Sequence, residues 1–167
     1  MIVRAERDGD AAAIHRVHEA AFPTPAEADL VERIRASDAF VPELSLLAEA
    51  PDGSVVGHVL LSYVDLAGHQ VLALAPMAVM PAWQGRGIGS ALVVAALDAA
   101  EVREEPLVVV LGHAGFYPRF GFRAASRYGI YPSAPWPDAA FMAKPLTTWQ
   151  AELRGRVTYP PVFDGID

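Results

Sequence analysis

Three alternating glycines, Gly85, Gly87 and Gly89, give the clearest indication of a functional site. They follow an apolar run (71–80) and precede a segment rich in Ala, Leu and Val (91–100), which predicts a strand, a tight turn and a helix. The first N–H groups of a helix lack partners and carry partial positive charge, and glycines let a phosphate reach the main chain. The sequence therefore predicts a site for a phosphorylated cofactor, although such a turn also occurs as a plain connection.

The spacing of these glycines separates the known kinds of phosphate-binding turn. A Walker loop places a lysine directly after its last glycine, whereas Ser90 follows Gly89 here. A dinucleotide-binding turn requires two residues before its last glycine, and only one separates Gly87 from Gly89, so an NAD-binding domain is disfavoured. The interpretation that fits is Gln84-x-x-Gly87-x-Gly89 between a strand and a helix.

That pattern resembles the acyl-CoA-binding motif of the GNAT N-acetyltransferase superfamily, in which the turn holds the pyrophosphate of coenzyme A. Residues 40–45, 56–62, 74–79 and 116–122 also resemble a YhbS-like bacterial subgroup of that family, and the resemblance covers nearly the whole chain. It implies an α/β (α+β) fold with a mixed central β-sheet, splayed in a V between its fourth and fifth strands and flanked by helices. The sequence departs from the subgroup at residues 112–114, where Gly-His-Ala replaces the usual Gly-Asp-Pro.

The same resemblance implies acetyl-CoA as co-substrate and no metal, although the sequence does not separate acetyl from longer acyl donors. Backbone N–H groups at the end of the fourth strand would stabilise the developing oxyanion. The implied cofactor contacts are Met77, Ala78, Val79, Gln84, Gly85, Arg86, Gly87, Ile88, Gly89, Ser90 and Tyr117. Pro76 lacks an N–H, which fits either a bulge beside a ligand or an irregularity without function.

Acyl transfer from a thioester to an amine needs a neutral amine, an oxyanion donor, a proton for the thiolate and alignment of both substrates. Tyr117 is the expected general acid, because GNAT enzymes commonly place a tyrosine at this point and a phenol, whose pKa lies near 10, stays protonated at neutral pH. The alternative is a packing role within the aromatic group Phe116, Tyr117, Phe120 and Phe122. No covalent intermediate is required, which suits a chain without cysteine.

The general base is less clearly indicated. The apolar run 71–80 contains no carboxylate, although many GNAT enzymes place one there. His113 follows a predicted strand and is either a base acting through water, since histidine titrates near neutral pH, or an ordinary loop residue. Glu43, in a loop that borders the acceptor cleft in this fold, is the second candidate. His15 and His18 stand at helical spacing without a third ligand, so no metal site is expected.

The leading interpretation is an acetyl-CoA-dependent N-acetyltransferase that acylates a primary amine of a small molecule or peptide by direct attack. The absence of an obvious base leaves a non-catalytic acyl-CoA-binding or regulatory module as the alternative. A polyamine, an aminoglycoside-like amine and a peptide amine all suit an acidic chain. A monomer and a homodimer both remain open.

The composition limits the domain organisation, the partners and the compartment that can be expected. With 167 residues, of which 53% are apolar and 20% charged, the chain fits one globular domain over residues 1–167 with a C-terminal tail from about 147 packed on it. The formal net charge of −7 argues against a nucleic-acid partner. The absence of cysteine, signal peptide and long apolar run predicts a cytoplasmic protein without membrane association.

Periodicity and turn signals predict the elements that must position these residues. Strands are expected at residues 2–5, 46–50, 55–63, 69–80, 107–111 and, last, within 139–146. Helices are expected from Asp10 to Phe22, from about 26 to 35 and from the glycine turn to about 103. Residues 112–122 are expected to form a short helical turn that enters another strand.

Overall fold

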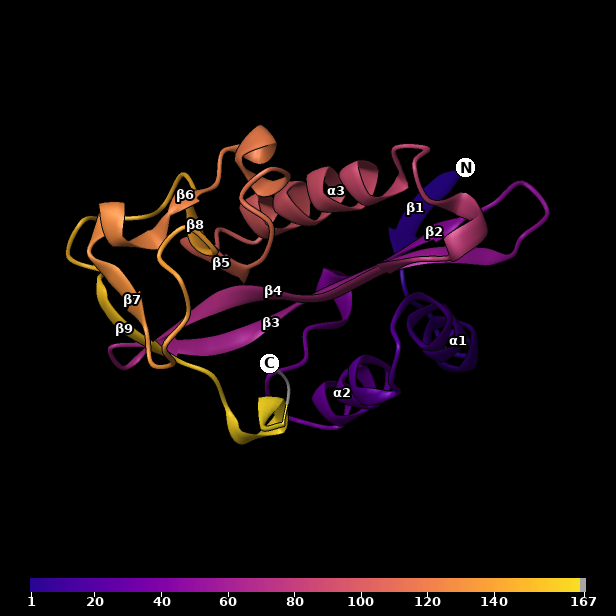
Figure 1. Ribbon diagram of the computed structural model, residues 1–167, viewed down its shortest axis with the longest axis horizontal. Helices are drawn as coiled ribbons and strands as arrows, with labels where there is room; N and C mark the ends of the chain where they lie inside the picture. Colours follow the sequence, from indigo (N-terminus) through magenta and orange to yellow (C-terminus); the bar gives the residue numbers. More distant parts are fainter. Residues whose placement is uncertain (166–167) are drawn as a thin grey trace.

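In the computed structural model, which describes residues 1–165, one mixed β-sheet carries helices on both faces (Figure 1). Helix α3 (Ile88–Val102) covers one face, and α1 (Ala11–Ala21) and α2 (Ala26–Arg35) lie on the other. The strands are β1 (Ile2–Ala5), β2 (Ser45–Glu49), β3 (Val55–Leu66), β4 (His69–Val79), β5 (Leu107–Leu111), β6 (Arg123–Ala124), β7 (Ile130–Pro132), β8 (Phe141–Pro145) and β9 (Gly155–Thr158). Short 3₁₀ helices are η1 (Pro42–Leu44), η2 (Pro81–Trp83), η3 (Tyr117–Phe120), η4 (Ala125–Tyr128) and η5 (Pro161–Phe163). None of the helices within residues 1–165 is long and apolar enough to cross a membrane.

The sheet opens between β4 and β5. Its main path is β1-β2-β3-β4-β5-β8-β6, and along this path only β4 and β5 run parallel. Their pairing is short: Leu72 lies opposite Val108 and Ala73 opposite Val109, whereas β4 continues to Val79. The expected splay between the fourth and fifth strands is therefore confirmed.

A β-bulge interrupts β4 next to the splay. The register with β3 shifts between Val59 and Leu61, so Ala75 and Pro76 lie opposite the single residue Leu60. Proline lacks the N–H that a regular ladder needs at this point, and a bulge accommodates that loss. The bulge leaves an irregular strand edge where β4 parts from β5.

Both faces of the central strands are buried, which explains their nearly continuous apolar sequence. Side chains of a strand alternate between the two faces. Leu72 and Leu74 of β4 join the core beneath α3, whereas Val71 and Ala73 join the core beneath α1 and α2. This double burial fixes the ends of β4 and β5 relative to the helices.

The C-terminal region adds two strands that the sequence analysis did not predict. β7 and β9 pair with each other in parallel, and β9 also extends the end of β3 at Asp65 and Leu66. The tail then packs on α2, where Arg33 Nε donates to the Val162 carbonyl at 3.1 Å. The expected tail, residues 147–167, is described only as far as Gly165, and residues 166 and 167 lie outside the described part.

Candidate functional site

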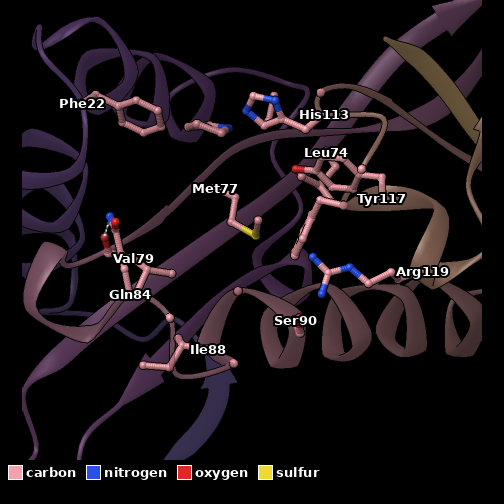
Figure 2. A pocket seen from close by; sticks show the side chains of 18 of the residues that line it. Phe22, Leu74, Met77, Val79, Gln84, Ile88, Ser90, His113, Tyr117 and Arg119 are labelled. Atoms are coloured by element: carbon pink, nitrogen blue, oxygen red, sulfur yellow. Dashed lines mark hydrogen bonds between the residues drawn. The ribbon is translucent and has the colours of Figure 1, made fainter. Parts of the chain in front are cut away.

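A cavity of about 940 Å³ lies where β4 and β5 part. Its walls come from the α1–α2 connection with the first turn of α2, the end of β4, the glycine turn with the start of α3, and the β5–η3 loop with η3 itself. Figure 2 shows Phe22 and His113 on one side of this cavity and Ile88 and Ser90 of α3 on the other. The cavity therefore connects both faces of the sheet through its splay.

The glycine turn presents free backbone donors to the cavity. Gly85 and Gly87 adopt positive φ angles of 76° and 82°, a conformation that favours glycine. Within residues 1–165 the N–H groups of residues 85–87 donate no hydrogen bond, and the Ala91 N–H to Gly87 carbonyl bond (3.0 Å) starts the helical ladder. Gln84 Nε2 donates to the Val79 carbonyl at 3.0 Å and ties the turn to the end of β4. Such a helix N-terminus suits an anion.

Gly57 of β3 sets how closely the start of α3 approaches the sheet. A Cβ at this position would meet Leu92 Cδ1 at 3.0 Å and Ile88 Cγ2 at 3.1 Å. The missing side chain lets the first turns of α3 lie directly on β3. It thereby positions the helix N-terminus beside the end of β4.

Arg119 supplies a positive charge that the sequence analysis missed. It lines the cavity, and its guanidinium lies 4.7 Å from the centroid of the Phe116 ring. Within residues 1–165 it forms no ion pair with a carboxylate. Figure 2 shows it on the side of the cavity formed by α3, near Ser90. A helix N-terminus and a neighbouring free guanidinium together form a site for phosphate groups.

Most of the predicted cofactor contacts line this cavity, with two exceptions. Arg86 stacks over Trp83, with its guanidinium carbon 4.8 Å from the ring centroid, and does not line the cavity. Ala78 is buried opposite His58 in the ladder between β3 and β4 and does not line it either. Successive side chains of β4 face opposite sides of the sheet, so Met77 and Val79 face the cavity while Ala78 does not.

Tyr117 combines a packing contact with an accessible hydroxyl. Its ring contacts Phe116 and Phe122 edge to face, with centroids 5.0 and 5.6 Å apart. The residue is only 8% exposed, and burial raises the pKa of Tyr117 to about 12. Figure 2 shows its hydroxyl pointing into the cavity. The phenol is therefore a neutral hydrogen-bond donor over the whole ordinary pH range.

His113 lines the same cavity as Tyr117. Its carbonyl accepts hydrogen bonds from the N–H groups of Phe116 (3.1 Å) and Tyr117 (3.3 Å), which fixes the turn between β5 and η3. Figure 2 shows the two side chains next to each other. The structure therefore brings together these two predicted site residues.

Glu43 lies elsewhere. The short helix η1 buries Leu44 in the core and leaves the Glu43 side chain 67% exposed. Its carboxylate lies 3.4 Å from Arg103, just beyond the C-terminal end of α3, and Glu43 does not line the cavity. The conformation of η1 sets this placement, and no pattern of residues around Glu43 indicates that conformation.

Among the residues that the structure describes, Glu27 is the carboxylate that lines the cavity, and it was not predicted from the sequence. It lies in the first turn of α2, and its Oε2 atom is buried without a hydrogen-bond partner within residues 1–165. Leaving a buried carboxylate oxygen unpaired is costly. A ligand with a positive charge or an N–H donor would remove that cost.

A second group of polar side chains is buried beneath α1, outside the cavity wall. Ser45 Oγ bonds Glu6 Oε1, His58 Nε2 lies 2.8 Å from Ser45 Oγ, and His18 Nε2 lies 2.8 Å from His58 Nδ1. Arg35 bonds both oxygens of the Glu6 carboxylate at 3.0 and 3.2 Å.

The direction of these bonds follows from the carboxylate, which only accepts. Ser45 therefore donates to Glu6 and accepts from His58 Nε2–H, so that His58 Nδ1 accepts from His18 Nε2–H. His18 Nδ1 is left as a bare, buried acceptor. Burial lowers the pKa of His18 to about 4 and that of His58 well below its usual value. Both rings are therefore neutral at pH 7.

Acidic side chains of α2 approach His15 on the surface. Ligand atoms of His15, Asp29 and Glu32 lie within 4.8 Å of one another, so α2 supplies neighbours that the spacing within α1 did not reveal. His15 lies 3.0 Å from Glu32 and 3.4 Å from Glu19, which are ordinary ion-pair distances. None of these residues lines the cavity.

Comparison with known proteins places this geometry in context. The family model described as "Acetyltransferase (GNAT) domain" matches residues 42–124. The "Uncharacterized N-acetyltransferase YjhQ" of Escherichia coli K12 is 36% identical over 157 residues, which cover 89% of this chain and 86% of that protein.

Two solved structures are similar over nearly the full length. The crystal structure of YhbS from Escherichia coli in complex with CoA has a TM-score of 0.92 and 30% identity, covering 99% of this chain and 93% of that one. A GNAT family acetyltransferase from Brucella melitensis in complex with acetyl-CoA has a TM-score of 0.80 and 33% identity, covering 98% and 97%.

Proposed function

The chain belongs to the GNAT acetyltransferase family, and from this premise we propose that it transfers the acetyl group of acetyl-CoA to a primary amine by direct attack. The observation that carries the proposal is the cavity of about 940 Å³, which the donors of the glycine turn share with the Tyr117 hydroxyl. Ligand cavities of small molecules span roughly 300–1,000 Å³. The solved relatives from E. coli and B. melitensis hold CoA and acetyl-CoA, which supports the assignment of the donor.

The chain offers groups that fit each part of such a donor. The N–H groups of residues 85–87, the first N–H groups of α3 and the Arg119 guanidinium would hold its phosphates. A side chain at Gly87 would project into open space, where nothing lies within 4 Å, and would occupy the position that a phosphate needs. Backbone N–H groups near Met77 and Val79 would bind the thioester oxygen as it becomes an oxyanion.

In the proposed reaction the nitrogen lone pair of the neutral amine forms the new C–N bond, the C–S bond breaks, and CoA leaves as a thiolate. His113 accepts, through water, the proton that the ammonium group must lose before attack. Tyr117 donates its hydroxyl proton to the thiolate and recovers a proton from solvent. The nitrogen releases its second proton as the amide forms, so the products are an acetamide, free CoA and one net proton.

Titration calorimetry with acetyl-CoA on Gly87→Glu tests the donor half. The matched control is Gly53→Glu, because Gly53 also has a positive φ (88°) and open space around its missing Cβ but lies in the β2–β3 hairpin. We expect Gly87→Glu to lose acetyl-CoA binding at least a hundredfold and Gly53→Glu to bind normally. Normal binding by Gly87→Glu would contradict the cofactor assignment.

A non-catalytic acyl-CoA-binding module remains the second candidate, favoured by the lack of a carboxylate on the cavity side of β4. Release of free CoA in the presence of a panel of primary amines separates the two functions. An enzyme releases CoA in proportion to the acetamide formed, whereas a binding module releases none.

A further inference from the structure

A second cavity of about 370 Å³ lies next to the first one. Ala75 and Leu111 line both cavities, so the two meet where the bulge in β4 faces the end of β5. The other walls come from the loop between β7 and β8, the segment after β9 and η5. We call this second cavity the aromatic chamber, defined by Trp136, Tyr159 and Phe163 together with the shared residues Ala75 and Leu111.

Aromatic rings from the loop between β7 and β8 and from the segment after β9 form its walls. Trp136 contacts Tyr159 edge to face at a centroid distance of 5.5 Å, and Tyr159 contacts Phe163 in the same way at 5.0 Å. Ser133 Oγ, at the rim, already bonds the Val157 carbonyl at 2.7 Å. Burial raises the pKa of Tyr159, so its phenol stays neutral. These walls suit an apolar or aromatic group of small-molecule size.

The charged side chains around the two cavities are separated by sign, with the cation on the side of α3 and the carboxylates elsewhere. Arg119, on the side of α3, is the cation among the described residues that line them, apart from the titratable His113. The carboxylates are Glu27 in the main cavity and Asp164, which is exposed at the rim of the chamber. The glycine turn and Arg119 would be occupied by the phosphates of the donor. With the donor bound, the buried Oε2 atom of Glu27 would still lack a partner of opposite charge, whereas Asp164 is exposed to solvent.

We propose that the acceptor is a small primary amine with an apolar or aromatic body, whose ammonium group binds Glu27 and whose body enters the aromatic chamber. The inference rests on the proposed acetyltransferase function and narrows its acceptor. A polyamine would bring a second ammonium group into a chamber in which none of the residues that the structure describes offers a buried carboxylate. A peptide amine or an aminoglycoside would place polar groups against aromatic rings that offer few partners.

Titration calorimetry on the full-length protein saturated with CoA measures acceptor binding without turnover. The probes are 2-phenylethylamine, methylamine (no body), 2-phenylethanol (no ammonium), spermidine and a glycyl peptide. We expect 2-phenylethylamine to bind at least tenfold more tightly than every other probe and to give the highest kcat/KM for CoA release. Equal or tighter binding of spermidine or of the peptide would overturn the inference.

Matched variants locate the two halves of the acceptor. Glu27→Gln is expected to weaken binding of 2-phenylethylamine about tenfold, whereas Glu32→Gln, a change on the same helix outside the cavity, leaves it unchanged. Ala134→Trp fills the chamber from its wall and is expected to abolish binding of 2-phenylethylamine. Tyr131→Ala, an exposed aromatic change on β7, is expected to have no effect. Unchanged binding in both Glu27→Gln and Ala134→Trp would overturn the assignment.

Acetyl-CoA binding, measured on the same proteins, separates failure of the inference from failure of the proposed function. All four variants are expected to bind acetyl-CoA normally, which also reports that they are folded. If acetyl-CoA binds to the wild type but 2-phenylethylamine has no advantage over spermidine and the peptide, the acceptor class is wrong and the donor assignment stands. If acetyl-CoA itself does not bind, both proposals fail.

Discussion

The aromatic ring of Tyr117 lies directly against the backbone of Gly112, so closely that a Cβ on Gly112 would overlap the ring, with Cδ2 at only 2.9 Å. Gly112 does not adopt a positive φ, so the position requires space and not an unusual backbone conformation. Gly112, the first residue after β5, thus determines where the Tyr117 hydroxyl points. This contact links the end of β5 to the chemistry proposed for the cavity.

Gly112→Ala should displace Tyr117 and reduce acetyl transfer. The methyl group would push the ring away from β5, with an overpacking cost of about 1–3 kcal/mol in unfolding free energy. We expect kcat to fall at least tenfold, measured as CoA release. The matched control is Gly115→Ala, because nothing lies within 4 Å of the Cβ that it adds. Equal activity of the two variants would contradict a positioning role for Gly112.

Tyr117→Phe should keep the ring contacts and remove the proton donor. Because the packing against Phe116 and Phe122 is retained, the melting temperature and acetyl-CoA affinity should change little. General acid catalysis contributes roughly 10²- to 10⁴-fold, and a loss of kcat in that range is expected. In the wild type the pKa of about 12 means that Tyr117 causes no loss of activity below about pH 11. Undiminished kcat in the variant would remove Tyr117 from the acid role.

Arg119→Ala should weaken acetyl-CoA binding about tenfold or more, because a guanidinium that is free of protein carboxylates bonds a phosphate strongly. The dependence of the dissociation constant on salt should also become shallower. Arg127→Ala removes the same charge from an exposed position outside both cavities and serves as the control. Identical salt dependence in Arg119→Ala and the wild type would exclude a phosphate contact.

The buried histidines should make the fold sensitive to acid. An unfolded histidine has a pKa near 6.5, whereas that of His18 is about 4 in the fold, so the unfolded state binds more protons between these values. The contribution of neutral His18 to the free energy of unfolding is fully present above about pH 6.5. It is lost as the pH falls towards 4, which lowers the free energy of unfolding by about 2–3 kcal/mol for this one proton.

Urea unfolding of the wild type and of the double variant His18→Gln/His58→Gln at pH 7 and pH 4.5 measures this effect. The difference between the two pH values should be smaller in the double variant, because Gln does not titrate. The groups around the pair are Glu6, Arg35 and His15, and they remain in both proteins. An equal loss of stability in both proteins would show that the histidines are not its source.

The elements whose conformation is set by local sequence patterns were predicted well. The turn from Gln84 to Ser90 and the strand Leu107–Leu111 follow from local glycines and β-branched residues, and the structure has the helix and the strand where they were expected. The splay between β4 and β5 came from the family resemblance and is confirmed.

The features that depend on distant segments could not be predicted in the same way. Glu27 lies at the start of a helix whose sequence only indicated amphipathic packing, and its exposure to the cavity depends on how α2 sits on the sheet. β9 is short and begins with Gly155, so its pairing with β3 becomes visible only in three dimensions. Glu43 is the opposite case: it was predicted to lie at the site, but its carboxylate lies beside Arg103, away from the cavity.

Ala75 and Leu111 line both cavities, so the proposed sites for the donor and the acceptor adjoin, and this bears on the kinetic mechanism. Two sites that meet at one wall hold both substrates at once, and the chain has no cysteine to carry the acetyl group between them. Catalysis should therefore pass through a ternary complex, so double-reciprocal plots of initial velocity at several fixed amine concentrations should intersect instead of running parallel. In the proposed reaction, neither product therefore forms until both substrates have bound on the two sides of the bulge in β4.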